Sequence, residues 1–142
     1  MTTLTSDRFT VQSGHRITVQ VPETDVNAVI TAVTSVDQLI YGDYDNVTFT
    51  SQTGTQGFRA LGTGRNVATQ SVVTVPCVEL SFFCAGDAVP LIEAIYGVHP
   101  YEEPVIFIAP ILRSLHVSGQ DEDNPNRFWN RLMPSWVPTE HR

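Results

Sequence analysis

Two stretches of this chain carry the same strand-then-helix pattern and lie 63 residues apart. In each stretch, apolar residues first alternate with polar ones, which is typical of a half-buried strand. They then recur every three or four positions, which is typical of one face of a helix. The repetition limits the fold strongly, because it predicts two strand–helix–strand halves that share one core. The alternating positions are Ile17, Val19 and Val21 in the first stretch and Val78, Leu80, Phe82 and Cys84 in the second.

The expected ends of the two helices follow from turn and cap residues. Thr24 is a suitable N-cap for the first helix. Asp87 can cap the second, Pro90 is tolerated in its first turn, and Gly97 stands where a left-handed C-cap is expected. The apolar helix faces consist of Val26, Val29, Ile30 and Val33 in the first and Leu91, Ile92 and Ile95 in the second.

Each helix is followed by a further strand pattern, in "YDNVTFTSQ" and in "EEPVIFIAP". A glycine-rich segment between the two halves is typical of a long hairpin or a pair of loops. This order predicts an α+β, ferredoxin-like βαβ-βαβ sandwich, with two helices on one face of an antiparallel sheet. We assign residues 1–14 to a flexible arm, 15–111 to the ferredoxin-like domain and 112–142 to a C-terminal extension.

The second face of the sheet also carries apolar residues. Phe83 and Ile106 or Ile108 fall on the opposite parity from the residues under the helices. An antiparallel sheet leaves a face in water only when that face is polar. We therefore expect other copies of the chain to cover this face, in a homo-oligomer.

The extension changes in character after Leu112. An acidic, polar linker precedes a segment that holds both tryptophans of the chain. Aromatic residues at this density lower solubility when exposed, so we expect Phe128, Trp129 and Trp136 to dock on a neighbouring subunit or on the open sheet face.

Charge and hydropathy exclude several classes of partner. The net charge is −7 with only 8 Lys and Arg residues, which argues against a nucleic-acid or anionic-membrane surface. No run approaches the roughly 20 apolar residues of a membrane span. The N-terminal residues lack the features of a signal peptide, so we expect a cytoplasmic protein. Cys77 and Cys84 are expected to be buried free thiols on opposite faces of one strand.

The run "GVHPYEEP" offers two interpretations. His99 with Glu102 or Glu103, beside Tyr101, could supply ligands to a divalent metal or contact a small ligand. Pro100 instead forces His99 into an extended conformation, and a second proline limits pairing at the start of the next strand. We favour a stiff turn over a metal site, and an extended geometry favours Glu103 over Glu102 as the partner of His99.

The loop "LGTGRN" is the second candidate site. Gly62, Gly64 and Arg65 could bind an anion through backbone N–H groups and the guanidinium. The segment is neither a Walker loop nor a dinucleotide fingerprint, because no Gly-Lys-Ser/Thr follows and no helix opens after the glycines. Ordinary hairpin chemistry is the favoured interpretation.

Three segments resemble a known family: "VPETDVNAVITAV", "YGDYDNVTFTSQTGTQGFRALG" and above all "GVHPYEEP". The chain resembles, over about 15–110, the YqfO-like, CutA-like insert domain of the dinuclear-metal proteins that are homologs of GTP cyclohydrolase type 2. The resemblance implies a ferredoxin-like fold similar to CutA and the PII signalling proteins, which assemble as trimers. It places the two metals of the parent family in flanking domains outside the match, so it does not imply hydrolase activity.

These patterns predict a non-catalytic, CutA/PII-like oligomeric module that binds a small ligand or a divalent metal, or regulates a partner. One alternative is an enzyme with a site between subunits, in which His99 and Glu103 act as an acid–base pair. The other is a structural adaptor that recruits a partner through its C-terminal tail.

Overall fold

A computed structural model describes residues 4–142 of the chain. These residues form two compact units, one of residues 12–113 and one that combines the segment up to residue 11 with residues 114–142. The regular elements are β1 (Phe9–Val21), α1 (Val26–Thr34), β2 (Phe49–Thr50), β3 (Gly54–Phe58), β4 (Val73–Cys84), α2 (Val89–Val98) and β5 (Val105–His116). Short 3-10 turns occupy Glu23–Asp25, Phe128–Asn130 and Thr139–His141.

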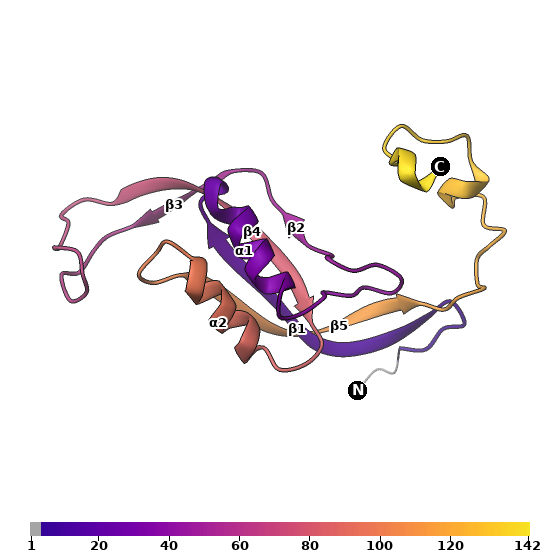
Figure 1. The fold of residues 1–142 in the computed structure, drawn as a ribbon, viewed down its shortest axis with the longest axis horizontal. Coiled ribbons are helices and arrows are strands. Elements are labelled where there is room, and N and C mark those ends of the chain that lie inside the picture. The colour runs from indigo at the N-terminus through magenta and orange to yellow at the C-terminus, as the bar shows by residue number, and fades with distance from the viewer. Residues whose placement is uncertain (1–3) are drawn as a thin grey trace. The chain divides into compact units, whose positions relative to one another are not determined.

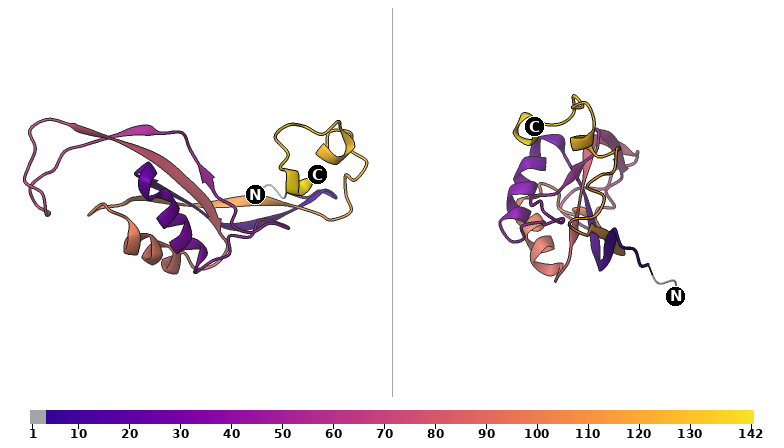
Figure 2. Two further views of the ribbon diagram at one scale, coloured as in Figure 1. Left: turned by 45° about the horizontal axis from the view of Figure 1, so that its top comes forward. Right: turned by 90° about the vertical axis from the view of Figure 1, so that its right-hand side faces the viewer.

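The strands form an antiparallel sheet in the order β2-β4-β1-β5, and β3 pairs with the first half of β4. The register between the two central strands places Val19 opposite Leu80 and Ile17 opposite Phe82. The helices α1 and α2 lie side by side on one face of this sheet (Figures 1 and 2). The predicted α+β, ferredoxin-like sandwich is therefore confirmed.

The core lies between the two helices and the central strands. Its strand residues are those that alternate in the sequence, and its helix residues come from the predicted apolar faces. Burying each such side chain stabilises the fold by roughly 1.5–3 kcal/mol. The fully buried side chains include Ile17, Val19, Val21, Val29, Val33, Leu80, Cys84, Leu91 and Ile95.

The helix ends differ in part from the prediction. Gly97 lies inside α2, which continues to Val98, and it has no left-handed backbone conformation. Pro100 ends the helix instead, because it holds His99 extended at ψ 132°. The N-cap residue of α2 is Ala88 rather than the predicted Asp87, although the Asp87 carboxylate accepts a hydrogen bond from the Val89 N–H at 3.0 Å.

The first helix also begins differently from the prediction. Thr24 lies inside the 3-10 turn and makes no capping bond to α1. The turn at Glu23–Asp25 follows Pro22 directly, so the chain enters α1 through a tighter helix rather than through a side-chain cap.

Two strand predictions are corrected. β1 begins at Phe9, so residues 9–14 of the predicted flexible arm are strand, while residues 1–3 lie outside the described part. Ile106 packs against the core under the helices and does not belong to the second face of the sheet. A single alternating strand does not show which of its faces is covered when both carry apolar residues.

The second face of the sheet has a polar centre and exposed aromatic residues. The Gln20 side chain bridges Gln56 and Glu79 through hydrogen bonds of 2.7 and 3.1 Å. Phe49 lies opposite Ser81 and is 67% exposed, and Phe107 is 56% exposed. This face is apolar only in part.

The smaller unit is held by a compact network of its own. Asp121 pairs with Arg8 and with Arg127, each at 2.9 Å. The Trp129 indole N–H donates to the Glu122 carbonyl at 3.0 Å. The Phe128 ring packs edge-on against Trp129 and Trp136. None of the helices within residues 4–142 is both long and apolar enough to cross a membrane.

Candidate functional site

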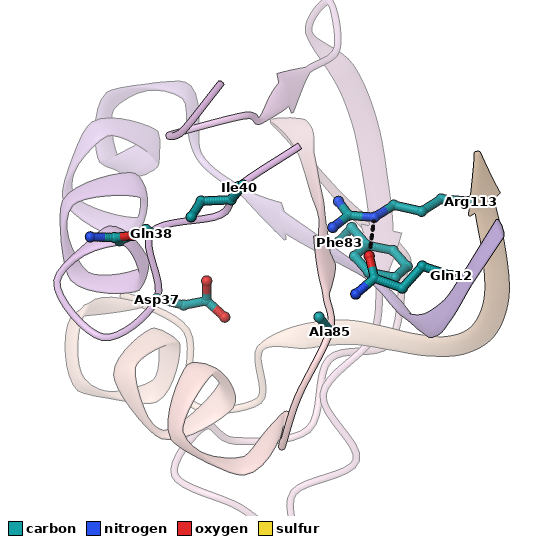
Figure 3. A pocket seen from close by; sticks show the side chains of 7 residues that line it. All are labelled: Gln12, Asp37, Gln38, Ile40, Phe83, Ala85 and Arg113. Atoms are coloured by element: carbon teal, nitrogen blue, oxygen red, sulfur yellow. Dashed lines mark hydrogen bonds between the residues drawn. The ribbon is translucent and has the colours of Figure 1, made fainter. Parts of the chain in front are cut away.

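A pocket of about 320 Å³ opens within the unit of residues 12–113. It lies between the segment that follows α1 and the neighbouring ends of β1, β4 and β5 (Figure 3). Its volume is at the lower end of the range of small-molecule sites. The lining residues are Gln12, Asp37, Gln38, Ile40, Phe83, Ala85 and Arg113.

The guanidinium of Arg113 forms one wall of the pocket. Its central carbon lies 3.8 Å from the centre of the Phe83 ring and 4.5 Å from that of Tyr41. Its Nε donates to Gln12 Oε1 at 3.0 Å. Within residues 4–142 the two terminal nitrogens have no hydrogen-bond partner, and no carboxylate lies within 4.0 Å. The side chain is thus held in place while four N–H donors stay free.

Close backbone packing fixes the aromatic wall. Gly14 lies directly under Phe83, and a Cβ at this position would come within 2.3 Å of the ring. Only glycine leaves room for that contact. Tyr41 is fixed from the other side by paired backbone bonds with Tyr44, in a turn where Gly42 has a φ of +62°. The sequence "YGDY" therefore places one ring over Arg113.

Asp37 lies on the opposite side of the pocket. Its Oδ1 accepts the Leu39 N–H at 2.8 Å, which supports the left-handed conformation of Leu39 at φ +51°. In Figure 3 the carboxylate of Asp37 and the guanidinium of Arg113 both point into the gap between them, whereas the Gln38 side chain points away. The pocket therefore presents one positive and one negative group.

Burial and charge act in opposite directions on Arg113. Burial lowers the pKa of the guanidinium, and the nearby Tyr41 and Asp37 raise it. An arginine stays protonated at neutral pH under these conditions. The pocket therefore offers a partly desolvated, permanent positive charge.

The structure places His99 at the end of α2, where it is buried. Its Nε2 lies 2.7 Å from the Gln20 carbonyl, and its Nδ1 accepts the Tyr101 N–H at 3.1 Å. The neutral ring with its proton on Nε2 satisfies both contacts. A metal would have to displace one of them, since a ligating nitrogen needs a free lone pair. This geometry favours the turn interpretation.

The two candidate segments of the sequence meet in space. Both carboxylate oxygens of Glu102 accept the backbone N–H of Arg65, at 3.0 and 3.1 Å. A Cβ on Gly64 would lie 2.7 Å from the same carboxylate. The backbone N–H of Arg65 is thus occupied by an anion from the chain itself. Gly62 has a φ of +88°, a left-handed backbone conformation that favours glycine.

Two other predicted site residues, Glu103 and Tyr101, take no part in this contact. Glu103 is exposed and makes no hydrogen bond within residues 4–142. The Tyr101 hydroxyl is buried and has no hydrogen-bond partner among residues 4–142, and burial, with smaller effects of Cys77 and Asp25, raises its pKa. No group of three or more His, Cys, Asp and Glu side chains that could hold a metal exists in the described part of the chain.

Sequence reasoning missed the pocket, since its residues come from four separate segments. Only one feature pointed to it: Arg113 is a lone cation at the end of the otherwise apolar stretch "VIFIAPILR". A charged residue is rarely buried unless its charge has a partner.

Comparison with known proteins supports the fold. No protein-family model matches the chain, and no curated protein matches its sequence. A Bacillus cereus protein related to NIF3 superposes with a TM-score of 0.59 at 24% identity, over 73% of this chain. CutA1 from the psychrotrophic bacterium Shewanella sp. SIB1 superposes with a TM-score of 0.51 at 17% identity, over 70% of this chain and 81% of its own. The chain spans 27% of the length of the NIF3-related protein.

Proposed function

We propose that the protein is a non-catalytic, CutA/PII-like module that binds a small ligand in the Arg113 pocket and thereby regulates a partner. The main support for this proposal is the geometry of Arg113. Its guanidinium is held by Gln12 and two aromatic rings, and its terminal N–H groups are free at the pocket wall among the described residues. A pre-oriented guanidinium loses little entropy on binding, which is how small sites gain affinity.

The other ligand and reaction schemes depend on His99. A divalent metal, or an acid–base pair with Glu103, requires a ring nitrogen that is free to bind a metal or exchange a proton. Both nitrogens are engaged with the backbone of Gln20 and Tyr101. These contacts support ligand binding at Arg113 over metal binding or catalysis at His99.

Binding can be tested with four small probes that share a short alkyl chain: 1-pentanol, pentanoate, butylamine and L-norvaline. We expect at least one to shift the amide NMR signals of the pocket residues at millimolar concentration. The Arg113→Gln variant should abolish those shifts, and Arg59→Gln, which removes an exposed arginine of the hairpin, should leave them unchanged. If no probe binds in an Arg113-dependent way, the proposed function is wrong.

We further propose that the module is a homo-oligomer, most simply a trimer, assembled through the second face of the sheet. The exposed rings of Phe49 and Phe107 on that face support this, because large apolar groups on a sheet surface favour association. Light scattering should give a mass that is a multiple of 15.7 kDa. A monodisperse monomer at micromolar concentration would exclude it.

A structural adaptor remains a second candidate, and the tail supports it. Leu132 is 97% exposed and Trp136 is 67% exposed. Exposed apolar residues of this size are common at sites of protein association. The discriminating experiment is deletion of residues 121–142: an adaptor loses its partner while the Arg113 pocket still binds its ligand.

A further inference from the structure

We propose that the Arg113 pocket takes a small zwitterion, with a carboxylate and an ammonium group a few ångströms apart, as in an α-amino acid. The inference rests on the proposed function, which requires only that some small ligand binds there. It goes further by naming the chemical class from the two charged groups that face each other across the pocket.

The Arg113 side recognises the carboxylate. The Nε is occupied by Gln12, and the rings of Phe83 and Tyr41 contact the guanidinium. The two terminal nitrogens are the part of the fork that stays available. Two parallel N–H donors match the two oxygens of a carboxylate and bind it in a bidentate way.

The Asp37 side recognises the ammonium group. One carboxylate oxygen accepts the Leu39 N–H, and the other makes no hydrogen bond within residues 4–142. No Lys, Arg or His nitrogen of the described residues lies within 4.0 Å of this carboxylate. A negative group that is fixed by its own loop and lacks a cation is a site for a donor from a ligand.

The two charges discriminate between ligands because they are not paired with each other. A simple anion is attracted by Arg113 and repelled by Asp37. A simple cation is attracted by Asp37 and repelled by Arg113. A zwitterion satisfies both groups, so its advantage comes from rejection of the alternatives as well as from attraction. Ile40, Ala85 and the Phe83 ring supply an apolar surface for a short side chain.

Three of the probes form a matched series for this inference. Pentanoate lacks only the ammonium group of L-norvaline, and butylamine lacks only its carboxylate. NMR titration of the wild-type chain should give the tightest binding for L-norvaline, with both analogues weaker by about tenfold or more, as expected when a charge-assisted hydrogen bond is lost.

The Asp37→Asn variant tests recognition of the ammonium group independently of the carboxylate. An asparagine can still accept the Leu39 N–H and tolerates the same turn, so the loop should keep its structure. The variant should weaken L-norvaline by about tenfold and leave pentanoate equal or tighter. Asp123→Asn makes the same charge change at an exposed position outside the pocket and should alter neither.

The outcomes distinguish this inference from the proposed function. If pentanoate or butylamine binds as tightly as L-norvaline and still depends on Arg113, the zwitterion inference is overturned and the pocket remains a ligand site. If Asp37→Asn binds L-norvaline as the wild type does, the inference is likewise overturned. If the binding of none of the four probes depends on Arg113, both this inference and the proposed function are wrong.

Discussion

His99 lies where α2 ends and the chain bends through residues 100–104. Its ring joins this bend to β1, because one nitrogen contacts the Gln20 carbonyl and the other accepts the Tyr101 N–H. A buried imidazole that satisfies two backbone groups stabilises the fold more than a solvated one, since its loss leaves those groups unpaired.

His99→Ala should therefore lower the free energy of unfolding by about 2 kcal/mol, measured by urea denaturation. His116→Ala, which removes an exposed histidine, should change it little. The metal hypothesis makes a different prediction: wild type binds zinc or copper in calorimetry, and His99→Ala loses that affinity with less effect on stability. Glu103→Gln should then lose more affinity than Glu102→Gln.

Three buried acidic groups make stability sensitive to high pH. Burial raises the pKa of the Cys77 and Cys84 thiols above the ordinary value of 9.0, and that of the Tyr101 hydroxyl above 10.0. Both cysteines are free and buried, as predicted. The folded chain therefore holds these protons more tightly than the unfolded chain does.

This stabilising effect is fully present below pH 9 and is lost as the pH rises through the raised folded-state pKa values of the two thiols and of Tyr101. Urea denaturation between pH 8 and pH 11 should show a falling free energy of unfolding. The double variant Cys77→Ala/Cys84→Ala should show a shallower decline as the pH rises above 9. An identical decline would mean that the thiols do not contribute.

The hairpin of β3 and β4 depends on a contact from outside itself. It extends beyond the two helices (Figure 1), and Glu102 binds the Arg65 N–H of its connecting loop. Gly64 is needed there because a side chain would meet the carboxylate. The bend after α2 thus anchors a loop that lies 37 residues earlier in the chain.

Glu102→Gln should loosen this loop without unfolding the core. We expect the Arg65 amide to exchange its hydrogen about two- to tenfold faster, because a charge-assisted bond is weakened. Glu103→Gln is the matched control, since this neighbouring glutamate is exposed and makes no bond within the described residues. Equal exchange in the two variants would contradict an anchoring role for Glu102.

The C-terminal tail can be used to monitor assembly, which is a property of the whole molecule. Both tryptophans lie in it, so intrinsic tryptophan fluorescence reports on the tail alone. In the single chain, Trp129 and Trp136 are each at least partly exposed to solvent. Docking on a second copy would bury them further.

We therefore expect the emission maximum to shift to shorter wavelength as protein concentration rises, in parallel with the mass from light scattering. Deletion of residues 121–142 should reduce the oligomer or lower its melting temperature. If mass rises while emission stays constant, or if the truncated chain keeps both its assembly and its melting temperature, the tail does not dock in the oligomer.

Local sequence patterns determined the architecture. Alternation identified Ile17, Val19 and Val21 as one buried face, and three- and four-residue spacing identified the inner faces of both helices, because these periods follow directly from backbone geometry. The same reasoning predicted two free, buried thiols on β4. Pro90 was correctly placed in the first turn of α2.

Only the tertiary structure decided the sites. It showed that Glu102 binds the loop of Gly64, and that Arg113 lies between Phe83 and Tyr41 and faces Asp37. It also placed Ile106 against the core. These contacts join residues far apart in the chain, and no local period encodes them. They depend on sheet register and loop path, which the packing of the whole domain sets.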